Sequence, residues 1–168
     1  MARTYSFDAL MELDDGASVH SASGFGQVGG VTQIIDLGGS PINTNFAVLM
    51  QIGALARIDA MCVVDVAAIT DATGETATVS LMGSNNSNGS APVNLATLLL
   101  GAGASLPNGS AGAASTGAGS TTSPGKFEMP FTNEQNGIVY EFVYIFVTIG
   151  STASIQFNTV YIAPQALE

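Results

Sequence analysis

One stretch near the end of the chain, Gly137–Pro164, constrains the fold more than any other. It reads GIVYEFVYIFVTIGSTASIQFNTVYIAP and divides at the polar residues Gly150-Ser151-Thr152. The first half is a run of β-branched and aromatic residues, which favours a strand over a helix. The second half alternates between two sets of residues with the period of a strand. The sequence therefore predicts two strands joined by a short polar turn, as a hairpin.

Both faces of the first predicted strand are apolar, so the strand needs cover on each side. One face carries Val139, Val143, Ile145, Val147 and Ile149. The other face carries Tyr140, Phe142, Tyr144 and Phe146. We expect this aromatic face to pack within a sandwich or between copies of the chain. In the second strand, alternation predicts one face with Ile155, Phe157, Thr159 and Tyr161, opposite Gln156, Asn158, Val160 and Ile162.

Further strands are predicted along the rest of the chain. They are Val31–Leu37, Phe46–Ile52, Arg57–Ile69, Glu75–Gly83 and Lys126–Phe131. Because proline cannot donate to a ladder, Pro130 predicts that the last of these is an edge strand or ends there. The stretch Val93–Leu100 fits either a short helix or a strand. Ser84–Pro92 and Gly101–Gly125 have the composition of loops.

These patterns predict an all-β fold, an antiparallel β-sandwich or jelly roll of about eight strands. Residues 1–32 are predicted to be an N-terminal arm that includes a flexible link over residues 21–30. This arm either forms a first strand at the sandwich edge or docks on a neighbouring molecule. Residues 33–168 are predicted to be a single sandwich domain, with residues 101–125 as a long surface loop.

Charge is scarce and one-sided in this chain of 168 residues. Three Lys and Arg residues stand against 13 Asp and Glu residues, for a formal net charge of −10. So few basic residues disfavour nucleic-acid binding. No apolar run is long enough to predict a membrane span, and no signal peptide is visible at the N-terminus. We expect synthesis in a cytoplasm.

The inventory for chemistry is small, and we expect no catalytic, cofactor or metal site. His20 is the only histidine and falls in the predicted flexible N-terminal arm, where a triad base would not be held rigidly. Cys62 is the only cysteine, and its apolar surroundings predict a buried, inert thiol. Asp14 and Asp15 are predicted to be solvated carboxylates of a turn.

The motif Ile34-Ile35-Asp36-Leu37-Gly38 follows a Ser/Ala-rich arm, and a strand with Met129-Pro130 precedes the apolar stretch at the end of the chain. In this order and spacing, residues 7–164 resemble the capsid cement (decoration) proteins of tailed bacteriophages. The lead-in from Phe7-Asp8-Ala9 to Ser21-Ala22-Ser23 fits that family, whereas the long loop Gly101–Gly125 departs from it. The resemblance implies a jelly-roll protein on the outside of a phage head.

The function implied by this resemblance is structural. The partners would be the major capsid protein and further copies of the chain, as a homodimer or homotrimer. We expect capsid or inter-copy contacts through the apolar residues of the arm, Tyr5, Phe7, Leu10 and Met11. Deletion of residues 1–13 is expected to leave the fold intact and weaken attachment. The alternative is a phage tail, fibre or adhesin-type module that recognises a host surface glycan.

Overall fold

The computed structural model describes residues 7–38, 57–70, 75–101, 124–150 and 152–164. Strands take up 63% of the described residues and helix only 3%, and the sheets are antiparallel. The predicted all-β fold is therefore confirmed. Predictions that fall on Phe46–Ile52, on Tyr5 and on residues 102–123 of the predicted loop lie outside the described residues.

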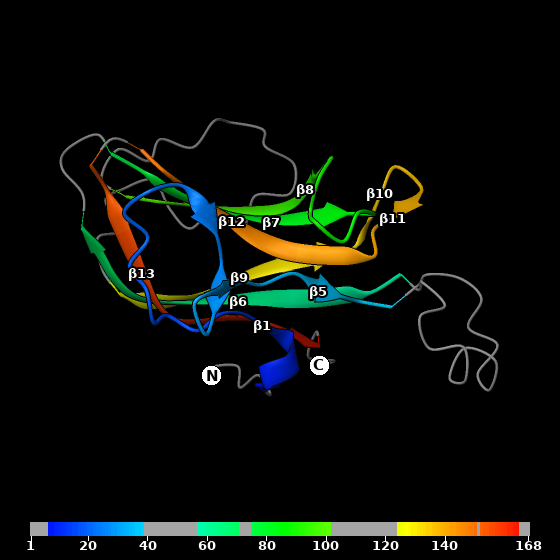
Figure 1. Cartoon of the computed structure of the whole chain (residues 1–168), viewed down its shortest axis with the longest axis horizontal. Coiled ribbons are helices and arrows are strands. Elements are labelled where there is room, and N and C mark those ends of the chain that lie inside the picture. The colour runs from blue at the N-terminus through cyan, green and yellow to red at the C-terminus, as the bar shows by residue number, and fades with distance from the viewer. Residues whose placement is uncertain (1–6, 39–56, 71–74, 102–123, 151, 165–168) are drawn as a thin grey trace.

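Two sheets form the layers of a sandwich (Figure 1). The first, which we call the β13 sheet, has the order β1-β13-β6-β9. The second, the β12 sheet, has the order β2-β12-β7-β8, with β5 also paired to β12. The strands of the β13 sheet are β1 (Glu12–Asp14), β6 (Asp59–Thr70), β9 (Gly125–Thr132) and β13 (Ser154–Pro164). Those of the β12 sheet are β2 (Gly24–Phe25), β5 (Ile35–Asp36), β7 (Ala77–Ser84), β8 (Val93–Leu100) and β12 (Phe142–Ile149).

The remaining elements are short. A 3-10 turn, η1 (Ala9–Met11), precedes β1. Two small hairpins are formed by β3 (Gln27–Val28) with β4 (Val31–Thr32), and by β10 (Glu134–Gln135) with β11 (Ile138–Val139). The ambiguous stretch Val93–Leu100 is thus a strand, because it pairs along its length with β7. The strand with Pro130 lies at the end of its sheet, as predicted.

The predicted hairpin of the two C-terminal strands is wrong, because β12 and β13 lie in different sheets. Each strand has hydrogen-bond neighbours in its own sheet, β7 for β12 and β6 for β13. The connection between them crosses from one layer to the other. It is fixed by the two residues before β7, since Gly150 N donates to Thr76 O (2.9 Å) and Thr152 N donates to Glu75 Oε1 (2.9 Å). Two successive apolar strands can therefore face each other across the core instead of pairing.

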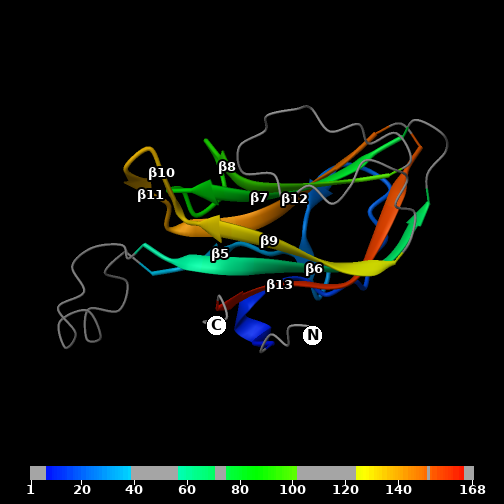
Figure 2. The same cartoon turned by 180° about the vertical axis from the view of Figure 1, so that it is seen from behind.

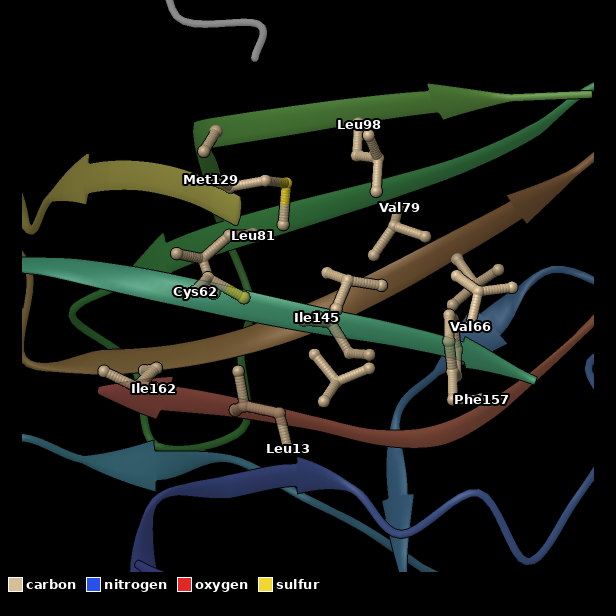
Figure 3. Packing of buried hydrophobic residues seen from close by; sticks show 14 of the residues in the cluster. Leu13, Cys62, Val66, Val79, Leu81, Leu98, Met129, Ile145, Phe157 and Ile162 are labelled. Atoms are coloured by element: carbon tan, nitrogen blue, oxygen red, sulfur yellow. The ribbon is translucent and has the colours of Figure 1, made fainter. Parts of the chain in front are cut away.

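The core fills the space between the two sheets (Figure 3). In two strands, the period-2 alternation of the sequence correctly predicted which side chains lie in this core. Ala60, Cys62, Val64 and Val66 of β6 and Ala77, Val79 and Leu81 of β7 all point inward. Opposite them, Val143, Ile145 and Val147 of β12 are buried in the same cluster.

The alternation predicted for the C-terminal strand assigns the wrong side chains to the core in the second half of β13. Val160 and Ile162 lie in the core, whereas Thr159 and Tyr161 lie on the outside of the sheet. The cause is an irregularity in the pairing with β6 on either side of Phe157, where Asn158 has no partner in the ladder. An extra residue in a strand shifts every later side chain to the opposite face.

The N-terminal region joins both sheets along one side of the sandwich (Figures 1 and 2). β1 pairs with β13, while β2 and β5 both pair with β12. Between them, Gly26 N donates to Ile145 O (3.1 Å) and Asp15 N donates to Gln27 O (3.0 Å). Of the two readings of the arm, residues 12–36 follow the first, because they extend the sheets of their own chain. The prediction of a flexible link over residues 21–30 is wrong at β2 and β3, which are hydrogen-bonded strands.

Candidate contact surface

The outer face of the β13 sheet carries a second, smaller apolar cluster. Met61 and Val63 of β6 and Tyr161 and Ala163 of β13 are buried there. Part of their cover comes from Phe7, whose ring meets that of Tyr161 edge to face, with centroids 5.3 Å apart. The side of this sheet that faces away from the β12 sheet is also where η1 lies (Figures 1 and 2). Phe7 and η1 therefore cover part of this face of the sandwich.

The turn η1 is fixed by local hydrogen bonds. Asp8 caps it, since its Oδ1 accepts from Leu10 N (3.0 Å), and Met11 N donates to Asp8 O (2.9 Å). Capping of this kind satisfies backbone donors that a helix start leaves free. Met11 packs against the main core. Leu10 points away from it and is 81% exposed.

The predicted contact residues are thus brought together only in part. Phe7 is 52% exposed and Leu10 81% exposed, whereas Met11 serves the core. The large exposed hydrophobic residues of the described ranges are Phe7, Leu10, Val19, Val31 and Ile138. Phe7 and Leu10 are three residues apart in one segment on the outer side of the β13 sheet. We call residues 7–11 the contact segment.

The other predicted face, on β12, is largely covered by the chain itself. Tyr140 precedes β12, is buried, and is bound through its backbone to Asn133. Tyr144 is buried, and its hydroxyl donates to Gly89 O (2.8 Å) in the β7–β8 loop. Burial raises the pKa of Tyr144 above its usual range. Phe142 is half-buried.

Phe25 of β2 completes the cover of this aromatic face. Its ring lies 5.0 Å from that of Tyr144 and 5.4 Å from that of Phe146, the latter edge to face. Such pairs contribute about 0.5–1.5 kcal/mol beyond area burial. The β7–β8 loop that holds Tyr144 is itself ordered by hydrogen bonds. Ser84 Oγ donates to Ser90 O (2.6 Å), and Asn85 Oδ1 accepts from Glu141 N (3.0 Å). Most of this aromatic face is therefore covered by Phe25 and the β7–β8 loop of the same chain.

The basic residues that the structure describes are engaged with acids. Arg57 contacts Asp59 (3.2 Å) and Glu134 (3.6 Å), and Lys126 contacts Asp65 (3.4 Å). These pairs are largely exposed and contribute little stability. They leave the described surface without a basic patch of the kind that binds nucleic-acid phosphates.

Sequence reasoning missed a buried polar pair in the N-terminal region. Asp14 is 2% exposed and His20 is 8% exposed, and His20 Nε2 lies 2.9 Å from Asp14 Oδ2. The predictions of a solvated histidine and a solvated Asp14 are wrong, because β13 packs beside both residues. Asp15 is closer to the prediction: it is partly exposed, and hydrogen bonds from Gly29 N and Ala17 N lower the pKa of its carboxyl. A lone histidine in a Ser/Ala/Gly-rich stretch gave no signal of a buried partner.

The remaining expectations for chemistry concern Cys62 and metals. Cys62 is fully buried, as predicted, and burial raises the pKa of its thiol to about 12. Within the described ranges, no three His, Cys, Asp or Glu side chains come together as metal ligands would. No helix in those ranges is long and apolar enough to span a membrane.

The motif Ile34–Gly38 has a structural explanation. Ile35 is buried in the core, and Leu37 packs against it. Ile35 and Asp36 pair with β12, Leu37 N donates to Glu141 O (2.8 Å), and Asp36 Oδ1 accepts from Gly38 N (2.8 Å). The motif attaches the N-terminal region to the β12 sheet. Comparisons with family models, curated proteins and solved structures found no match for this chain.

Proposed function

We propose that this chain is a structural virion protein that decorates the outer surface of a bacteriophage head and cements neighbouring major capsid subunits. It would act by binding alone, without catalysis, cofactor, nucleic acid or membrane. The order of motifs along residues 7–164 and the jelly-roll type of the resembled family motivate the proposal. The net charge of −10 suits a site on the outside of a shell packed with DNA.

The observation that carries the proposal furthest is the contact segment. Leu10 is held outward on a capped turn, beside a Phe7 that is half exposed, over the outer face of the β13 sheet. A backbone turn that is already ordered in the free chain loses less entropy on binding, which favours the use of its exposed side chain as an anchor. The partner would present an apolar pocket to Leu10. Acidic Asp8 lies within the segment and Glu12 follows it, so basic groups at the rim of that pocket would complement them.

Self-association as a homodimer or homotrimer is part of the same proposal. Several copies joined together would hold the shell at several points, and linked contacts raise the overall affinity. Tyr144 is an unsuitable residue for such a contact, since its own chain already buries it. Phe142 and Phe146, both half-buried, are the members of the aromatic face that remain accessible.

The test is co-sedimentation of the purified protein with phage heads that lack it, with light scattering to give its oligomeric state. The proposal predicts saturable binding at a fixed ratio to the major capsid protein, and heads that resist bursting at higher temperature. Leu10→Ser should weaken this binding. Ile138→Ser is the matched control, because Ile138 is also exposed (51%) but lies on β11.

Two outcomes would contradict the proposal. Failure of the wild-type protein to bind heads would remove the cement function. Binding to host cells or their surface glycans, in place of heads, would assign the chain to the alternative class of tail, fibre or adhesin modules. Equal weakening by Leu10→Ser and Ile138→Ser would retain the cement function but remove the contact segment from it.

A further inference from the structure

We infer that the buried pair Asp14–His20 is a latch that positions the contact segment, and that its loss promotes local opening of residues 7–20 while β7 and β8 stay folded. Asp14 follows the contact segment by three residues and ends β1. The latch is a property of the free chain. Its consequence for attachment rests on the proposed function.

The carboxylate of Asp14 is within hydrogen-bonding distance of three separate parts of the N-terminal region. Its Oδ1 accepts from Gly16 N (2.9 Å), and its Oδ2 accepts from Gln27 N (3.0 Å) and lies 2.9 Å from His20 Nε2. The arrangement joins β1, the turn after it, β3 and His20 at one point. Loss of the imidazole would leave this buried carboxylate with its two backbone donors and one hydrogen bond fewer, and hydrogen bonds to carboxylates contribute more than those between neutral groups.

His20 connects this point to the β13 sheet. Its backbone exchanges two hydrogen bonds with Ile155, His20 N to Ile155 O (2.8 Å) and Ile155 N to His20 O (3.0 Å). Its ring lies 5.4 Å from that of Phe157. Gly16, in the left-handed region at φ +68°, sits so close to Phe157 O that a Cβ could not fit. Residues 16–20 therefore contact β13 at two places, at His20 and at Gly16.

Besides the latch, the region is held by Leu13, which is fully buried in the core, and by short pairings with β13. β1 has three residues, and its register with β13 shifts within them. Between β1 and His20, Ala17, Ser18 and Val19 are exposed. By contrast, β6 and β13 pair over ten residue pairs. Segments with few buried contacts open locally before the whole fold opens.

The neighbouring charged groups have partners of their own. Glu12 Oε1 accepts from Thr159 Oγ1 (2.9 Å), and the Asp15 carboxylate accepts from Gly29 N (2.7 Å) and Ala17 N (3.0 Å). Among the described residues, His20 is the basic group bonded to Asp14. Substitution of His20 therefore tests the latch without disturbing the hydrogen bonds of Glu12 or Asp15.

The experiment is native-state hydrogen exchange on His20→Ala and His20→Gln. Loss of the imidazole is expected to speed exchange at residues 7–20 by roughly tenfold or more, with amides of β7 and β8 unchanged. His20→Gln, which keeps an amide donor, should show a smaller increase. Val19→Ala, an exposed neighbour, is the control and should change nothing.

Uniformly faster exchange over both sheets, loss of the fold in both variants, or no change at residues 7–20 would each overturn the latch. Head binding then tests the link to attachment. Weaker binding by His20→Ala, with Phe7 and Leu10 intact, supports it. Local opening with unchanged head binding would keep the latch and remove its role in attachment, whereas failure of the wild-type protein to bind would concern the proposed function alone.

Discussion

The outer faces of the two sheets are covered in different ways. On the β12 sheet, Tyr144 is covered by Phe25 and by a loop whose Gly89 carbonyl accepts from its hydroxyl. On the β13 sheet, Tyr161 is covered by Phe7, and the segment that supplies this ring leaves Leu10 almost entirely exposed. The first face is completed by an ordered loop of the same chain. The second is completed by a segment that adds a new apolar surface, and so it is the face we assign to a partner.

The largest effect is expected from Tyr144→Ala. Removal of a buried aromatic side chain creates a cavity and costs about 3–5 kcal/mol in the free energy of unfolding. Urea unfolding would measure it, with Phe146→Ala as a control that should cost less because Phe146 is only half-buried. A loss below about 1 kcal/mol would show that the loop does not cover this face as described.

A smaller effect is expected from Tyr144→Phe. The ring packing stays, but Gly89 O loses its donor, and an unsatisfied buried acceptor costs about 1–3 kcal/mol. Hydrogen exchange should also quicken in residues 85–90. Unchanged stability and exchange would mean that water replaces the hydroxyl without cost.

The same hydroxyl predicts a dependence on alkaline pH. Burial raises the pKa of Tyr144 in the folded chain, so its contribution to stability is complete at neutral pH and is lost as the pH rises past the range where tyrosine in an unfolded chain ionises. Unfolding at about pH 8 and about pH 10.5 would measure this. The difference between the two should be smaller in Tyr144→Phe; an equal difference would point to other groups.

On the other face, Phe7→Ala is expected to cost about 1 kcal/mol, because one half-exposed ring and its edge-to-face contact with Tyr161 are lost. Thermal unfolding of this variant and of Tyr144→Ala under the same conditions compares the two losses of stability directly. A cost as large as that of Tyr144→Ala would make the two faces equivalent and weaken the assignment.

The smallest effect on stability is expected from Leu10→Ser, less than about 0.5 kcal/mol, since the side chain is 81% exposed. This substitution separates folding from attachment. The deletion of residues 1–13 does not, because Leu13 is fully buried in the core and its loss would destabilise the sandwich.

The sequence predicted those features that depend on local periodicity. Period-2 alternation in β6 and β7 identified the inward side chains, and Pro130 identified an edge strand. The same rule failed in β13, because nothing in the alternation marks Asn158 as unpaired. The false hairpin arose because a short polar connection fits both a turn within one sheet and a crossing between two.

Local sequence patterns also failed to predict the surroundings of the contact segment and of the latch. Phe7 and Leu10 were predicted to make contacts, yet their exposure depends on β13 and on the cap at Asp8. Met11 was grouped with them by sequence but packs inward. The burial of Asp14 and His20 follows from the docking of residues 12–20 on β13, a long-range contact that no local pattern encodes.

The most direct test of the account is hydroxyl-radical footprinting of the protein bound to heads, compared with the free protein. We predict protection of Phe7 and Leu10 on binding, with little change at Phe25 and Phe146. Protection of Phe25, Phe146 or the β7–β8 loop, with Leu10 still reactive, would place the partner on the β12 sheet and contradict the assignment of the contact surface.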